Sequence, residues 1–175
     1  MRERPSRAGR RVVQIDPVTS VELDEVLQFM RTLWVTVHGL QKASKRMNRT
    51  LHVTGPQRLV IRVVGLSPGI SAGALAKVLH LHPSTLTGVL KRLETQRLVS
   101  RVRDAGDGRR AVLRLTPGGQ TLNVAMAGTV EAAVKSALSR VPADHQRAAR
   151  NVLEALAEAL DVGEPKTGQR PSRRR

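Results

Sequence analysis

Residues 103–119 read RDAGDGRRAVLRLTPGG and join a turn, a strand and a helix start in one short segment. The five residues Asp104 to Gly108 are dense in turn formers. On either side of them, residues 99–103 and 111–115 alternate with the period of two that is typical of strands. The segment therefore predicts a two-stranded antiparallel hairpin whose return strand begins beside two adjacent arginines, Arg109 and Arg110.

Two short helices are predicted directly before this hairpin. Ser71 is placed to cap the first helix, and its expected buried face consists of Leu75, Val78 and Leu79. After the turn at residues 80–82, Pro83 fits the first position of the second helix, where its missing N–H costs little. The buried face of that helix consists of Leu86, Val89, Leu90 and Leu93. Two short helices joined by a three-residue turn indicate a helix-turn-helix.

The outer face of the second helix carries small hydroxyl residues followed by two cations. Small side chains let a helix lie deep in the major groove, hydroxyls bond phosphates or base edges, and Lys or Arg reaches guanine acceptors. A solvated helix can carry the same residue types. This helix alone is therefore a weak indication of DNA binding, and the segments next to it must support that interpretation. The residues expected to contact DNA from this helix are Ser84, Thr85, Thr87, Gly88, Lys91 and Arg92.

A hairpin that directly follows a helix-turn-helix is a wing, and arginines at its tip would meet the narrow minor groove, whose negative potential attracts them. We expect Asp104 and Asp107 to order the tip by capping backbone N–H groups and pairing with the arginines. The wing residues expected at the DNA are Arg101, Arg103, Asp107, Arg109 and Arg110.

Longer helices are predicted on both sides of the winged part. The spacing Thr19–Glu22 fits a capping box that opens a first helix reaching about Lys45, and Thr54–Gln57 repeats the spacing before a second helix. Thr116-Pro117 opens a helix expected to reach about Arg140, and Pro142 opens another. The apolar stripes of the first and the last two of these helices would stay exposed on a monomer, which predicts a dimer interface.

Charge and composition narrow the functional classes. The net charge is +16, and residues 71–116 hold nine basic but only three acidic side chains, whereas residues 117–162 hold four basic and five acidic ones. This clustering favours a polyanionic partner, with double-stranded DNA first. Cysteine is absent, which excludes disulfides and thiolate metal sites. With no apolar stretch of about 18 residues, we expect a cytoplasmic protein without a membrane partner.

The segment DGRRAVLRLT, Asp107 to Thr116, resembles the pattern D-x-R-x-x-x-L-x-L-T of the MarR family of bacterial transcription regulators. The preceding LAKVLHLHPSTLTGVLKRLETQRLVSRVRD resembles that family's helix-turn-helix and first wing strand. The resemblance covers roughly residues 20–161. It implies a mainly helical fold with a small β wing, a winged helix-turn-helix flanked by dimerisation helices from both chain ends, and a repressor that reads a pseudo-palindromic operator.

The resemblance also implies a division of the chain. Residues 19–161 would form the MarR-like domain, with dimerisation helices at 19–47 and 117–161 and the DNA-binding part at 54–116. Residues 1–18 and 162–175 would be disordered basic tails. The family often has a better helix cap than His82 before the recognition helix, which predicts a softer turn here. Without cysteine, the chain falls outside the oxidation-sensing branch of the family.

Other functions find weaker support in the sequence. His80 and His82 have no acidic or thiolate companion nearby, so no metal is expected. No nucleophile motif, phosphate loop or carboxylate pair stands out, so neither an enzyme nor a cofactor is expected. Family members often bind small aromatic acids near the dimer helices, where Trp34 and His38 could line an effector cavity. The alternative is that Trp34 belongs to the dimer core. Two alternatives to a regulator stay open: a sequence-tolerant architectural DNA-binding protein, and a winged-helix module for RNA or protein.

Overall fold

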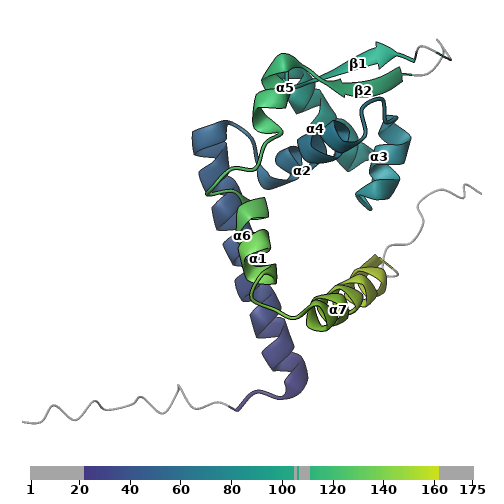
Figure 1. Ribbon diagram of the computed structural model, residues 1–175. Coiled ribbons are helices and arrows are strands. Elements are labelled where there is room, and N and C mark those ends of the chain that lie inside the picture. The colour runs from purple at the N-terminus through teal and green to yellow at the C-terminus, as the bar shows by residue number, and fades with distance from the viewer. Residues whose placement is uncertain (1–21, 105, 107–110, 162–175) are drawn as a thin grey trace, which may run out of the picture. The chain divides into compact units, whose positions relative to one another are not determined.

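The computed structural model describes residues 22–104, 106 and 111–161 of the chain (Figure 1). The chain divides into two units, residues 1–39 and 40–175, and the first helix, α1 (Glu25–Leu51), contributes to both. The tails predicted at residues 1–18 and 162–175 lie outside the described residues.

The bounds of α1 differ from the sequence prediction at both ends. The helix begins at Glu25, where the Asp24 carboxylate accepts a hydrogen bond from the backbone N–H of Leu27 at 2.8 Å. Asp24 therefore acts as the cap, while the predicted capping residue Thr19 lies outside the described residues. The helix also continues six residues beyond Lys45 and ends at Leu51, followed by His52 in the left-handed region at φ 56°.

The winged helix-turn-helix consists of α2 (Gly55–Leu66), α3 (Ala72–Val78), α4 (Pro83–Thr95) and a two-stranded sheet. The predicted capping box opens α2: Thr54 Oγ1 accepts from the Gln57 N–H, and Gln57 Oε1 accepts from the Thr54 N–H. One apolar core is formed by residues of these elements. Its buried residues are Val53, Val60, Ile61, Val64, Leu75, Ala76, Leu86, Leu90, Leu93, Val99 and Leu113.

The predicted wing strands are confirmed with their predicted bounds. β1 (Val99–Arg103) pairs antiparallel with β2 (Ala111–Leu115), from Val99 opposite Leu115 to Arg103 opposite Ala111. A short addition to this sheet had no sequence signal: Ser71, the cap of α3, forms a bridge with Val112. The wing is thereby anchored to the start of the helix-turn-helix.

One predicted core residue of α3 is exposed. Val78 is the last residue of this helix and is 58% exposed, whereas Ala76 is buried and belongs to the core. The helix ends in a Schellman motif, in which the Leu81 N–H bonds the Ala76 carbonyl and the His80 N–H bonds that of Lys77. His80 takes the left-handed conformation that this ending requires, at φ 49°.

The single helix predicted from Thr116 to about Arg140 is wrong, because the structure has two short helices there, α5 (Pro117–Leu122) and α6 (Val130–Leu138). At the end of α5 and directly after it, the backbone carbonyls of residues 122–124 accept hydrogen bonds from arginine side chains of α2. These carbonyls are therefore not paired with N–H groups of a continuing helix. Thr129 caps the new helix after Gly128, whose φ is +74°.

The last helix, α7 (Ala143–Asp161), follows Pro142 as predicted. From Ala143 to Leu160 none of its side chains is buried, and Val152, Leu153 and Leu160 are all more than 45% exposed. Within the part of the chain that the structure describes, every helix is too short or too polar to cross a bilayer.

Candidate nucleic-acid interface

Helix α4 presents one buried face and one exposed face. Leu86, Leu90 and Leu93 hold it against the core, each with at most 2% of its surface exposed. The opposite face carries all six residues predicted to contact DNA, and each of them is exposed: Ser84, Thr85, Thr87, Gly88, Lys91 and Arg92. Gly88 lies in open space, because a Cβ atom added there would meet nothing within 4 Å. The middle of this face is consequently flat and accessible.

The start of α4 is better capped than the sequence suggested. His82 Nδ1 accepts a hydrogen bond from the Ser84 N–H at 3.3 Å and lies 2.7 Å from Ser84 Oγ. His82 therefore acts as the N-cap of α4. With His80 ending α3 and His82 capping α4, both histidines have structural roles in the turn of the helix-turn-helix.

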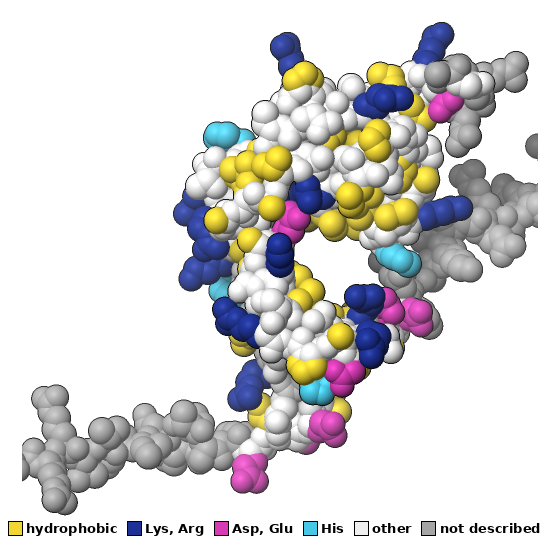
Figure 2. Space-filling view, in the orientation of Figure 1, with side chains coloured by type: hydrophobic (Ala, Val, Ile, Leu, Met, Phe, Trp, Pro, Cys, Tyr) yellow, Lys and Arg dark blue, Asp and Glu magenta, His cyan; other side chains and the backbone are white. Residues whose placement is uncertain are grey.

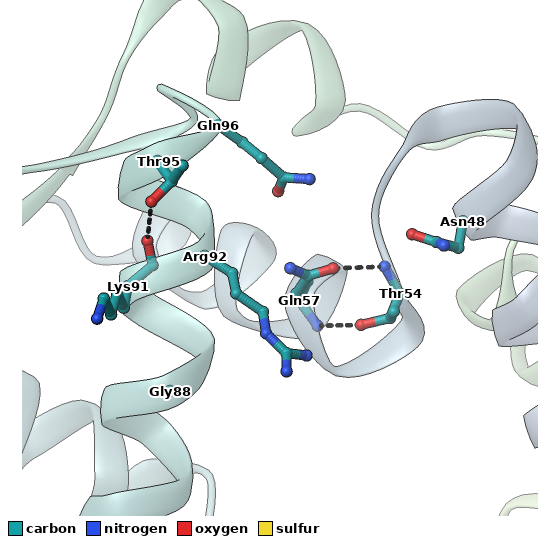
Figure 3. A pocket seen from close by; sticks show the side chains of 8 residues that line it. All are labelled: Asn48, Thr54, Gln57, Gly88, Lys91, Arg92, Thr95 and Gln96. Carbon is teal, nitrogen blue, oxygen red and sulfur yellow. Dashed lines mark hydrogen bonds between the residues drawn. The ribbon is translucent and has the colours of Figure 1, made fainter.

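A groove of about 610 Å³ runs beside the exposed face of α4 (Figure 3). One wall is α4, and the other is formed by the end of α1 and the start of α2. Arg92 extends from α4 into the space in front of Gln57 (Figure 3). The lining residues are Asn48, Thr54, Gln57, Gly88, Lys91, Arg92, Thr95 and Gln96.

The groove is cationic because Lys91 and Arg92 line it and none of its eight lining residues is acidic. The start of α2 adds little to the positive potential of the groove, because its backbone N–H groups already donate hydrogen bonds within the protein. The Gly55 N–H donates to Ser44 Oγ at 2.8 Å, and the Gln57 N–H donates to Thr54 Oγ1. Among the described residues, no carboxylate lies within ion-pair distance of Lys91 or Arg92. Their charges are therefore available to an anionic ligand.

The two described arginines of the wing have different surroundings. Arg103, at the end of β1, is exposed. Arg101 donates from Nε to Glu94 Oε1 at 2.5 Å, which joins the wing to the end of α4. Arg101 is therefore partly neutralised, and its contact is structural in the free protein.

At the wing tip, Asp104 Oδ1 accepts from the Gly106 N–H at 2.8 Å, which is the backbone capping predicted for this aspartate. The other three wing residues of the predicted site, Asp107, Arg109 and Arg110, lie outside the described residues, as does their predicted pairing.

Five groove residues were not part of the predicted site: Asn48, Thr54, Gln57, Thr95 and Gln96. Thr95 lies one helical turn after Lys91 and Arg92, so helical spacing from these two residues could have identified it. Thr54 and Gln57 had a signal only for capping, and Asn48 and Gln96 reach the groove through the tertiary fold. The Gln96 amide also donates to the His52 carbonyl at 2.8 Å, which joins the end of α4 to the end of α1.

The predicted effector residues lie elsewhere. Trp34 and His38 are exposed and one turn apart on α1, and neither lines the groove beside α4.

Two helices joined by a short turn, an exposed second helix and a following hairpin define a winged helix-turn-helix protein. A family model described as the MarR family matches residues 53–110, from the residue before the cap of α2 to the wing tip. The HTH-type transcriptional repressor Rv2887 of Mycobacterium tuberculosis is 32% identical over 106 residues, which cover 61% of this chain and 76% of that protein. The chain belongs to the MarR family of transcription regulators.

Two further similarities cover more of the chain. The organic hydroperoxide resistance transcriptional regulator of Bacillus subtilis is 27% identical over 143 residues, or 80% of this chain and 92% of that protein. The crystal structure of the PcaV transcriptional regulator from Streptomyces coelicolor, in complex with its natural ligand, matches with a TM-score of 0.56 and 27% identity. That match covers 71% of this chain and 91% of PcaV.

Proposed function

We propose that this chain is a homodimeric, sequence-specific DNA-binding regulator that acts as a transcriptional repressor. The observation that carries the proposal is the exposed face of α4, where Gly88, Lys91 and Arg92 border a groove without acidic residues. Such a face suits a recognition helix in the major groove, with the groove beside it open to the flanking phosphates. Arg103, Asp107, Arg109 and Arg110 would bring the wing to the minor groove, and Arg101 would join them after release from Glu94.

The dimer is supported by helices that cannot bury their own apolar side chains. Met47 is the only buried residue of α1. The N-terminal half of that helix exposes six large hydrophobic side chains: Val26, Leu27, Phe29, Met30, Trp34 and Val35. Figure 2 shows exposed hydrophobic side chains, in yellow, on the surface of the protein. Apolar stripes of this length mark association surfaces. We assign residues 19–47 and 117–161 to dimerisation and residues 54–116 to DNA binding.

Repression and an effector are supported by relatives. The mycobacterial relative is named as a repressor, and PcaV was crystallised with its natural ligand. A small-molecule effector would shift this chain between DNA-binding and non-binding states through its different affinity for the two. Since the sequence contains no cysteine, the signal cannot be cysteine oxidation.

Gly88→Ala tests whether α4 approaches DNA closely. In the free protein the added methyl group meets nothing within 4 Å, so alanine should stabilise the helix by about 1 kcal/mol. On DNA the same methyl group would hold the helix away from the groove, and we expect affinity to fall while stability rises. Urea unfolding and fluorescence anisotropy measure the two effects. Gly39→Ala, also in open space but on α1, is the control; equal affinities of both variants would contradict close approach.

Glu94→Gln should raise the affinity for DNA, whereas Gly88→Ala should lower it. The Arg101–Glu94 pair is more than 30% exposed on both sides, so its loss should change the free energy of unfolding by less than about 1 kcal/mol. The substitution removes an anion from the base of the wing and releases Arg101. Binding to any duplex should tighten, with a salt dependence steeper by about one ion. Weaker binding would instead show that the pair must hold the wing in position.

Selection from a pool of random duplexes tests the proposal as a whole. The recovered sequences should contain two inverted half-sites about one helical turn, or about 34 Å, apart, each bound by one protomer. Recovery of unrelated sequences would favour an architectural protein, for which the basic tails supply most of the affinity. Displacement of the selected duplex by structured RNA at equal concentration would favour an RNA-binding module.

A further inference from the structure

Three consecutive backbone carbonyls, at the last residue of α5 and the two residues after it, accept hydrogen bonds from two arginines of α2. Arg58 donates from Nη1 to the Leu122 carbonyl at 2.7 Å and from Nη2 to the Val124 carbonyl at 2.6 Å. Arg62 lies one turn later on the same face of α2. It donates to the Asn123 carbonyl, which lies between those of Leu122 and Val124, and also to Asn123 Oδ1. The course of the chain from α5 to α6 is thus fixed by side chains of the winged part.

Glu131, in the first turn of α6, completes this arrangement. Its two carboxylate oxygens each accept from one arginine, Oε2 from Arg58 Nη2 at 3.2 Å and Oε1 from Arg62 Nε at 3.1 Å. The Arg58 side chain is only 3% exposed, whereas that of Glu131 is 41% exposed. We call Arg58, Arg62 and Glu131 the arginine clamp. A buried guanidinium held by carbonyls and one carboxylate is stable only while these partners stay in place.

Two neighbouring contacts restrict the same junction. Gly65 of α2 lies so close to the Asn123 side chain that a Cβ atom would overlap it. The start of α6 is also held by α1, since the Val130 N–H lies 3.3 Å from Met47 Sδ and Met47 is buried. The junction is therefore held by contacts from both α1 and α2, although it joins two parts to which we assign different roles.

We propose that the arginine clamp fixes the direction in which the C-terminal helices leave the winged helix-turn-helix, and that it thereby sets the distance between the two recognition helices of the dimer. This inference rests on the proposed function, in which residues 117–161 belong to the dimer interface. Arg58 and Glu131 act as positioning residues: they lie away from the exposed face of α4 and determine which half-site spacing the dimer accepts. Sequence preference at each half-site remains with α4 and the wing.

Glu131→Gln is the variant that tests the clamp. It removes the shared negative charge but keeps a side chain of equal size at a partly exposed position, whereas replacing the buried Arg58 endangers folding. Glu164→Gln is the matched control, because it removes the same charge at a position outside the residues that we assign to dimerisation and to DNA binding. Since the chain has no cysteine, Lys77→Cys on the exposed side of α3 introduces a unique site for a spin label.

The first readout needs no DNA. Double electron–electron resonance on the labelled homodimer measures the distance between the two winged parts. We expect one narrow distribution for the parent and for Glu164→Gln, and a distribution at least twofold broader for Glu131→Gln. Equal widths in all three proteins would overturn the role of the clamp. Absence of any dipolar signal in the parent would contradict the dimer itself, so the two failures are distinguishable.

The second readout uses the selected duplex with its half-sites moved apart or together by one and two base pairs. The parent and Glu164→Gln should lose at least tenfold in affinity when the spacing changes, because one dimer geometry fits one spacing. Glu131→Gln should show less than threefold variation across the series while its affinity for a single half-site is unchanged. An unchanged spacing profile, or an equal loss at every spacing, would overturn the inference.

Discussion

Gly119→Ala is expected to lower the free energy of unfolding by about 2–3 kcal/mol. A Cβ atom at this position would overlap the carbonyl oxygen of Leu98 and lie 3.3 Å from Leu115 Cβ. The carbonyl cannot yield freely, since it accepts the Thr116 N–H at 3.1 Å where the wing passes into α5. Urea unfolding followed by circular dichroism, at one protein concentration, measures the change.

Gly118→Ala is the matched control for this prediction. Its Cβ atom would lie 3.5 Å from the Arg97 carbonyl and 3.6 Å from Leu98 Cδ2, which is ordinary contact. Alanine there should stabilise α5 by up to about 1 kcal/mol, because glycine is the poorer helix former. If Gly119→Ala were as stable as Gly118→Ala, the close approach of α5 to Leu98 would be contradicted.

Arg92→Ala is expected to weaken DNA binding by about 2 kcal/mol, or about thirtyfold. Arg92 points from α4 across the groove toward α2 (Figure 3), which suits a phosphate beside the recognition helix better than a base edge. The loss should therefore be similar on selected and scrambled duplexes, and the salt dependence should decrease by about one ion. Anisotropy titrations at several salt concentrations measure both effects.

Arg140→Ala controls for the loss of a positive charge. Arg140 follows α6, is exposed and contacts only Ser136 of its own turn through its guanidinium in the described contacts. Its removal should change affinity less than threefold if binding depends on position and not on net charge alone. Equal losses in Arg92→Ala and Arg140→Ala would contradict the assignment of the groove to DNA.

Local sequence patterns were sufficient to predict most of the winged helix-turn-helix. The period of two placed both strands with their observed bounds, and leucine spacing placed the buried face of α4 and, opposite to it, the exposed residues of the predicted site. The capping box of Thr54 and Gln57 was likewise readable, because its two hydrogen bonds join residues three positions apart. These features depend on neighbours in sequence.

The errors occurred where distant residues decide the structure. The helix expected from Thr116 to about Arg140 is interrupted after Leu122, where Arg58 and Arg62 of α2 donate to backbone carbonyls. The Val78 error is local instead: Val78 fitted the apolar pattern of α3, but it is the last residue of the helix and is exposed. The far wall of the groove comes from α1 and α2, so Asn48 could not be joined to α4 by any local spacing.

The affinity difference between the selected duplex and a scrambled duplex of equal composition tests the central claim most directly. The full chain is titrated into both by fluorescence anisotropy at physiological salt and at several concentrations around it. A sequence-specific regulator predicts a gap of about 4 kcal/mol or more at physiological salt. Equal affinities with a steep salt dependence would contradict sequence-specific regulation and assign the chain to sequence-tolerant DNA binding.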